Sequence, residues 1–202
     1  MEKQIDVYRV IINDNIEELT GVGIISFVES PAIERDFLKF SKDKDKLSLA
    51  VQDEQKRIAT GAILIPDKKI YRVDSSGYEY FIYMTKEDIQ KIVYKFFQTN
   101  KSQNVDIEHN GVLVNGVTMF ESFITDKNRG INPPSNFSDL PEGTWFGSFY
   151  VSNETVWNMI KAGELKGFSI CGLFDFKLEK NKETISQMKC FKELKELLEK
   201  VK

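Results

Sequence analysis

The sequence has few of the residues that most metal and redox sites use. It contains one histidine, His109, and two cysteines, Cys171 and Cys190, among 202 residues. Two cysteines cannot build a disulfide framework, and with a single histidine they do not form a zinc-ligand pattern. A glycine loop of the kind that holds phosphates in nucleotide-binding proteins is also missing. We therefore expect neither a metal ion nor an organic cofactor.

Long apolar runs and an excess of one charge are missing as well. The longest nearly uncharged stretch, Leu19–Val28, is half of the roughly 20 residues that a membrane-spanning helix needs. The first residues are polar and charged rather than apolar, so no signal peptide is expected. With 28 basic and 31 acidic residues, the net charge is −3. This balance gives no attraction for nucleic acid or an anionic membrane, and we expect neither as a partner.

The sequence does have an ordinary globular balance, with 41% hydrophobic and 29% charged residues. That balance excludes a wholly disordered or fibrous chain. Runs rich in β-branched residues and bounded by polar turns predict strands, and apolar residues at helical spacing predict helices. The predicted strands are 7–13, 21–29, 57–65, 78–85, 105–109, 116–125, 143–152 and 166–177, with a short candidate at 37–40. The predicted helices are 86–98, 154–162 and 183–201.

This order lacks the regular strand–helix alternation of βαβ units. We therefore predict an α+β, mainly β fold, in which a curved or closed, barrel-like antiparallel sheet is flanked by helices. Residues 1–180 are interpreted as one domain, with the charged segment 42–56 as a loop insertion. Residues 181–202 are interpreted as a C-terminal amphipathic helix. The irregular loop 126–142 is longer than ordinary connections, which favours a functional or flexible role.

Two further details concern the first helix and the core. Thr85 is predicted to cap the helix 86–98, with Asp88 at the capping-box position. Trp145 and Trp157 are interpreted as core residues rather than substrate contacts.

Two short segments carry residue types that serine hydrolysis needs. One ends the predicted strand 105–109 with His109, and the other places Ser169 on an apolar strand bracketed by glycines. A serine hydroxyl is a weak nucleophile unless a base takes its proton, and imidazole is the usual base. Flanking glycines leave backbone N–H groups free to stabilise an oxyanion. From the residues alone, a solvated turn histidine, a purely structural serine and a nucleophilic Cys171 all stay open as alternatives.

Several of these segments occur in the order seen in a known family. The stretches that carry the likeness are FVESPA at 27–32, TGAILIP at 60–66, EHNG at 108–111, GTW at 143–145 and GFSICG at 167–172. Together they resemble the phage prohead (capsid maturation) serine proteases, whose fold is similar to that of the herpesvirus assemblins. The likeness runs from about Val22 to Phe176. It implies a serine endopeptidase inside an assembling phage head in the host cytoplasm.

Carried over by position, the resemblance implies Ser169 as the nucleophile and His109 as the general base. Because the chain has one histidine, the third member of a triad has to be an acid, or the site is a dyad. We favour Glu121, since an adjacent antiparallel strand could bring its carboxylate to the imidazole N–H. Glu108 is disfavoured, because on a regular strand it faces away from His109. The other open alternatives are Asp106, Asp175 and an acid of the C-terminal helix.

The resemblance also carries expectations about oxyanion stabilisation and partners. Its members use an arginine-bearing loop, and Arg129 is the only arginine that follows His109. Phage scaffold and major capsid proteins are the implied substrates, and the protease itself is often cleaved too. A homo-oligomer is left open. The competing interpretation is a catalytically inactive structural or scaffold component of the prohead with the same fold.

Overall fold

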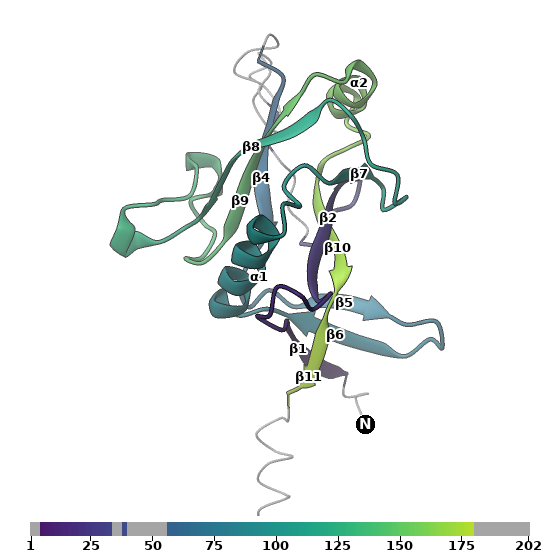
Figure 1. Ribbon diagram of the computed structural model, residues 1–202, viewed down its shortest axis with the longest axis vertical. Helices are drawn as coiled ribbons and strands as arrows, with labels where there is room; N and C mark the ends of the chain where they lie inside the picture. Colours follow the sequence, from purple (N-terminus) through teal and green to yellow (C-terminus); the bar gives the residue numbers. More distant parts are fainter. Residues whose placement is uncertain (1–4, 34–37, 40–55, 180–202) are drawn as a thin grey trace, which may run out of the picture.

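The computed structural model describes residues 5–33, 38–39 and 56–179. Within these residues the chain forms eleven strands and two α-helices (Figure 1). The strands are β1 Asp6–Ile11, β2 Gly21–Val28, β3 Leu38–Lys39, β4 Ile58–Leu64, β5 Ile70–Val73, β6 Glu79–Tyr83, β7 Val105–Ile107, β8 Val117–Ile124, β9 Trp145–Val151, β10 Gly167–Leu173 and β11 Asp175–Leu178. The helices are α1 Lys86–Gln98 and α2 Glu154–Ala162. The predicted helix 183–201 and most of the charged segment 42–56 lie outside the described residues.

Most predicted elements are confirmed, and three differ. Ile70–Val73, between two turn signals, was assigned no structure, but it forms β5 and pairs with β6 as a hairpin. The predicted strand 166–177 divides at Phe174 into β10 and β11, which belong to different sheets. The predicted strand 105–109 ends at Ile107, so His109 lies in the turn beyond β7.

The strands form three sheets rather than one curved sheet. Their orders are β11-β1-β6-β5, β10-β2-β7 and β3-β4-β9-β8. None of these three sheets closes into a barrel, and the pairs β1–β6 and β2–β7 are parallel. The α+β, mainly β class is therefore confirmed, whereas the single antiparallel, barrel-like sheet is not. Parallel pairs between strands far apart in sequence cannot be read from local patterns, because they depend on how long connections cross.

Helix α1 covers the space between the sheets (Figure 1). Its apolar residues recur at helical spacing, and Ile89, Ile92 and Phe96 are fully or almost fully buried. They join a core cluster with residues of β2, β4, β9, β10 and α2. Trp145 and Trp157 belong to this cluster, as predicted. The core thus supports the sheet β10-β2-β7 from the face that carries Phe27 and Phe168, leaving its opposite face for polar residues.

The start of α1 is held by a partly buried ion pair as well as by its cap. The predicted capping box between Thr85 and Asp88 is present. Arg9 of β1 donates two hydrogen bonds to the Asp88 carboxylate, at 2.8 and 2.9 Å. Burial alone would raise the pKa of Asp88, but the bonds from Arg9 and Thr85 outweigh it and lower that pKa below 3.8.

We predict that Asp88→Ala lowers the free energy of unfolding by about 3 kcal/mol at neutral pH, because it leaves the Arg9 charge without its partner. Since the folded-state pKa is depressed, this stabilisation is present above the unfolded pKa and disappears as the pH falls through the folded one. Urea unfolding of the wild type and of Asp88→Ala, at pH 7 and at pH 3, measures the loss in the free energy of unfolding at each pH. Glu87→Ala, at the exposed neighbouring position, should lower the free energy of unfolding much less, because water screens the Glu87 charge. Equal losses for the two variants would contradict the prediction.

Candidate active site

A row of three polar residues crosses the sheet β10-β2-β7. Ser169 of β10 lies directly opposite Ser26 of β2 in the antiparallel register, and Ser26 lies beside Asp106 of β7 in the parallel register. Residues in register project to the same face, and directly opposite Cβ atoms lie about 4.5–5.5 Å apart. Neighbouring strands (Figure 1) therefore place two hydroxyls and a carboxylate side by side.

This polar row is largely withdrawn from solvent. The exposed fraction is 0% for Ser26, 1% for Asp106 and 8% for Ser169. Buried hydroxyls and carboxylates are destabilising unless they find hydrogen-bond partners. Of the three residues, Ser169 is the one that solvent reaches most, so it is the one that a substrate can approach.

His109 is brought to this row by a tight turn after β7. Glu108 and His109 both have left-handed backbone conformations, with φ of 51° and 55°. Such values are uncommon outside glycine, and two in succession reverse the chain sharply. The turn is held at one end by the Glu108 N–H, which donates to the Phe27 carbonyl at 3.0 Å. At the other end the Gly111 N–H donates to Asp106 Oδ2 at 2.8 Å.

The imidazole of His109 contacts the middle of the row. Its Nδ1 lies 2.8 Å from Ser26 Oγ, within hydrogen-bond distance. With Nδ1 engaged by Ser26, Nε2 is the ring nitrogen left for a second hydroxyl. Ser169, the cross-strand partner of Ser26, is the nearest serine in the register. Among the described residues, however, no hydrogen bond joins Ser169 to His109, so the direct pair is not formed in this structure.

Asp106 has an unused hydrogen-bonding atom next to this contact. Its Oδ2 accepts the bond from Gly111, but Oδ1 is buried without any hydrogen-bond partner. A buried carboxylate oxygen without a partner is destabilising by roughly 1–3 kcal/mol or more. Ser26 is the lateral neighbour of Asp106 in the strand register, but no hydrogen bond joins their side chains in this structure. Asp106 therefore lies next to the Ser26–His109 contact without being bonded to it.

The favoured acid, Glu121, occupies a different place. It lies on β8, opposite Ser148 in the sheet β3-β4-β9-β8, and it is exposed. In the described part of the chain it has no hydrogen bond or ion pair with His109, so its catalytic role stays a prediction. Asp175 is exposed on β11, opposite Ile11 in a third sheet. The argument against Glu108 loses its basis, because the left-handed turn breaks the regular alternation of the strand. Cys171 is exposed on the same strand as Ser169.

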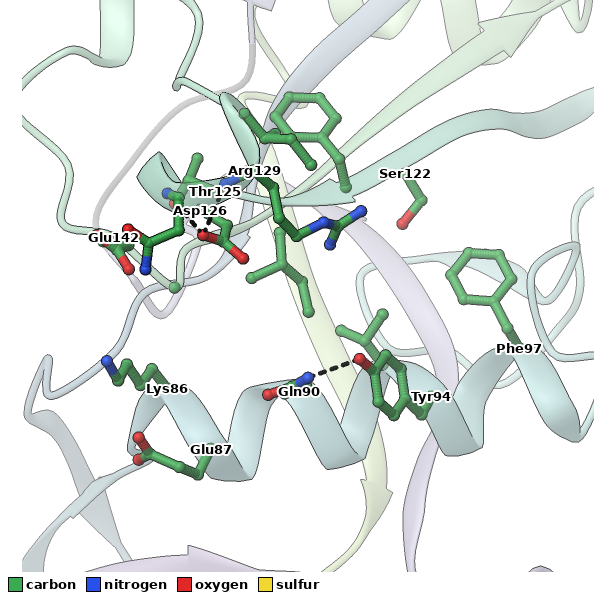
Figure 2. A pocket seen from close by; sticks show the side chains of 16 residues that line it. Lys86, Glu87, Gln90, Tyr94, Phe97, Ser122, Thr125, Asp126, Arg129 and Glu142 are labelled. Atoms are coloured by element: carbon green, nitrogen blue, oxygen red, sulfur yellow. Dashed lines mark hydrogen bonds between the residues drawn. The ribbon is translucent and has the colours of Figure 1, made fainter.

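Arg129, expected near the oxyanion, lines a separate cleft. This cleft has a volume of about 470 Å³ and lies between α1 and the end of β8 with the loop that follows it. Figure 2 shows the Arg129 guanidinium reaching across towards the helix, where Gln90 donates to the Tyr94 hydroxyl. Neither Ser169 nor His109 belongs to the lining of this cleft. Its walls carry side chains of both charges, and no hydroxyl among these lining residues is hydrogen-bonded to an acidic or basic side chain of the cleft.

Sequence reasoning missed Ser26. It lies in an apolar run, GVGIISFVE, where a single serine reads as a tolerated core position. The available signal was its place as the one hydroxyl within an otherwise apolar strand, since a buried hydroxyl needs a partner. That partner could not be named without knowing that β2 lies between β10 and β7. Three or more clustered metal-ligating side chains do not occur within the described residues.

Serine hydrolases combine a nucleophilic hydroxyl with an imidazole whose other nitrogen is held by a third polar group. The chain belongs to the family described as "Putative phage serine protease XkdF", whose model matches residues 46–177. It is 26% identical over 186 residues to the "Phage-like element PBSX protein XkdF" of Bacillus subtilis (strain 168). It is also 25% identical over 172 residues to the "Uncharacterized protein YqbD" of the same organism.

These alignments take in most of the chain but only part of each relative. They cover 86% and 82% of this chain, whereas the chain spans 60% of XkdF and 48% of YqbD. No solved structure gives a significant match. Neither α1 nor α2 is long and apolar enough to cross a membrane, and these are the α-helices in the described ranges.

Proposed function

We propose that this protein is a serine endopeptidase in which Ser169 is the nucleophile and His109 the general base. The observation that supports this best is the meeting of two segments 60 residues apart in sequence. Ser169 and His109 both adjoin Ser26, one through strand register and one through a 2.8 Å contact. Membership of a phage serine protease family supports the same chemistry.

The reaction then follows the course that a hydroxyl and an imidazole permit. As Ser169 Oγ bonds to the scissile carbonyl carbon, His109 takes its proton. The imidazolium returns that proton to the amine as the C–N bond breaks, which leaves an acyl-enzyme. Water, deprotonated by His109, then hydrolyses the ester and restores the serine.

In this proposal the Nδ1 side of His109 is held by Ser26, with Asp106 behind it. Such a partner fixes the ring orientation and stabilises the imidazolium, which is the task of the acid in a triad. Register and burial favour Asp106 over Glu121 for this task, because Asp106 lies in the polar row and Glu121 lies on another sheet. Both carboxylates stay as candidates until variants separate them.

For substrates, we propose phage scaffold and major capsid proteins, cleaved within an assembling head in the host cytoplasm. This part rests on the family and on the resemblance of the segments to the prohead proteases. A specific observation favours a second candidate function, an inactive structural component of the prohead. It is the missing direct hydrogen bond between Ser169 and His109 within the described residues.

A fluorophosphonate probe separates the two candidates. An activated serine displaces fluoride from phosphorus, so a P–O bond forms, the P–F bond breaks and the proton passes to the base. We expect one adduct on the native full chain, located on Ser169 by peptide mass spectrometry, and none on Ser169→Ala or His109→Ala. No adduct on the native protein would support the inactive component. An adduct on Ser26 would transfer the nucleophile to that residue.

A further inference from the structure

A small pocket runs along the outer edge of the strand that carries Ser169. β10 is an edge strand of its sheet as described, with β2 on its inner side. Five consecutive residues, 168–172, line the pocket, so it follows the strand edge rather than one face. Its volume is about 240 Å³. Pockets for drug-sized ligands are typically about 300–1,000 Å³, so this one suits one side chain or two.

The other walls of this β10 pocket are almost entirely apolar. They come from β1, β4 and the β5–β6 hairpin, and from the segments that follow β2, β6 and β10. The residues include Ile63, Ile70, Tyr80, Ile82 and Phe174. An apolar wall accepts the aliphatic stem of a side chain. By itself it would select a hydrophobic residue of a substrate.

One charged side chain interrupts this apolar wall. Arg72 of β5 lines the pocket and is only partly exposed. Burial lowers the pKa of its guanidinium from the ordinary value. Its hydrogen bond goes to the Tyr71 carbonyl at 3.0 Å, and no carboxylate within the described ranges forms an ion pair with it.

The acidic residues around the β5–β6 hairpin are engaged elsewhere. Glu79 accepts a hydrogen bond from the Tyr71 hydroxyl at 2.6 Å. Asp74 accepts bonds from Ser76 and Tyr78 within its own turn. Asp6 of β1 accepts a bond from the Tyr78 hydroxyl. Arg72 therefore lines the pocket without an ion pair to any of these three carboxylates.

Building on the proposed protease function, we infer that the β10 pocket selects an acidic side chain, glutamate above all, within about three residues of the scissile bond. The apolar wall would hold the methylene stem, and Arg72 would bind the carboxylate. Guanidinium and carboxylate match in a two-bond geometry, and such charge-assisted bonds are stronger where water is excluded. Aspartate has a shorter stem and would reach Arg72 less well.

The test is an unbiased specificity profile. The full-length protein digests a peptide library made from a whole proteome, and the new amino termini give the residues on both sides of each cut. We expect glutamate to be enriched about 10-fold or more at one position within three residues of the cut. Arg72→Gln should abolish this enrichment, Arg72→Glu should shift it to lysine or arginine, and Arg72→Lys should keep it in part.

The matched control is Arg57→Gln, which removes an arginine that pairs with Glu154 away from the pocket. This variant should leave the profile unchanged. Thermal unfolding of each variant shows whether it folds, and partial retention in Arg72→Lys keeps the test valid if Arg72→Glu does not fold. Cleavage without acidic enrichment, or with the same enrichment in Arg72→Gln, would overturn the inference while leaving the protease intact.

A binding measurement separates this inference from the proposed function. Fluorescence anisotropy compares two labelled peptides of alternating apolar residues, one with a central glutamate and one with glutamine, on the Ser169→Ala protein. The glutamate peptide should bind about 10-fold more tightly, and Arg72→Gln should remove the difference. If the wild type cleaves nothing but this preference holds, the protease function fails and the acidic site stands. Equal binding of both peptides would refute the site.

Discussion

Ser169→Ala is expected to lower cleavage by about 10³-fold or more, the largest effect on activity that we predict. Removing the nucleophile leaves only substrate binding and any oxyanion stabilisation, which retain a small residual rate. Because nucleophile and base act as a unit, Ser169→Ala combined with His109→Ala should be little worse than either alone. The measurement is the rate of processing of the proposed substrates, phage scaffold and major capsid proteins, co-expressed with each variant of the full chain.

Two neighbouring positions serve as controls for this variant. Ser26→Ala removes the hydroxyl that holds His109 Nδ1 and should lower the rate by up to about 10²-fold, since a misplaced base still acts. Cys171→Ala should leave the rate close to that of the wild type. Equal processing by Ser169→Ala and the wild type would remove Ser169 from the mechanism. If Ser26→Ala or Cys171→Ala lost more cleavage activity than Ser169→Ala, the role of nucleophile would pass to that residue.

The same assay distinguishes the candidate acids. If Asp106 supports the imidazolium through Ser26, Asp106→Asn should slow the chemical step with little change in KM. Glu121→Gln should then retain most of the activity, because Glu121 lies on another sheet and is exposed. The reverse order of effects would restore Glu121 as the third member. Thermal unfolding excludes a loss that comes only from a destabilised sheet.

Gly172→Ala is expected to cause the largest loss of stability, about 3 kcal/mol or more. A Cβ atom at this position would lie 2.1 Å from the Gly21 carbonyl oxygen and 2.9 Å from the Gly21 carbonyl carbon. Both are backbone atoms, so no side chain can move aside, and β10 would have to separate from β2. The register is already irregular between Cys171 and Gly172, where the two strands approach closely.

The matched control for Gly172 is a glycine on the partner strand. At Gly23 a Cβ atom would meet only the Cys171 carbonyl oxygen, at 3.8 Å, which is an ordinary contact. Gly23→Ala should therefore change the free energy of unfolding by less than about 1 kcal/mol. Urea unfolding of both variants gives the comparison. If Gly172→Ala and Gly23→Ala were similarly stable, β10 and β2 could separate at Gly172 without lowering the free energy of unfolding. Ser169 would then be less firmly positioned than the register indicates.

Local sequence patterns predict best those helices and strands whose signal lies within a few neighbouring residues. The bounds of α1 and α2 follow from apolar spacing and from side chains such as Thr85 and Asp88 that cap the helix. Strands with long β-branched runs follow for the same reason. The short strand β5 was missed, because four residues between two turns pair as a strand only when β6 lies beside them.

In the candidate site, too, some residues can be identified from the sequence and others only from the structure. Ser169 and His109 can be named from the sequence, because each is an unusual residue in its own segment and the order of segments resembles a known family. Ser26 and Arg72 could not be named. Ser26 is a candidate only because β10 and β7 lie on either side of it, and Arg72 only because apolar residues surround it in the pocket.

By itself, the sequence determined the class of the fold, the helices α1 and α2, most of the described strands and the two residues of the proposed catalytic pair. Composition and periodicity act over short distances along the chain, so they are visible without a structure. Only the tertiary structure decided that there are three sheets, that His109 turns back onto Ser26, and that Asp106 lies next to it. These relations depend on register and on long connections, and a shift of one residue would turn each side chain to the other face.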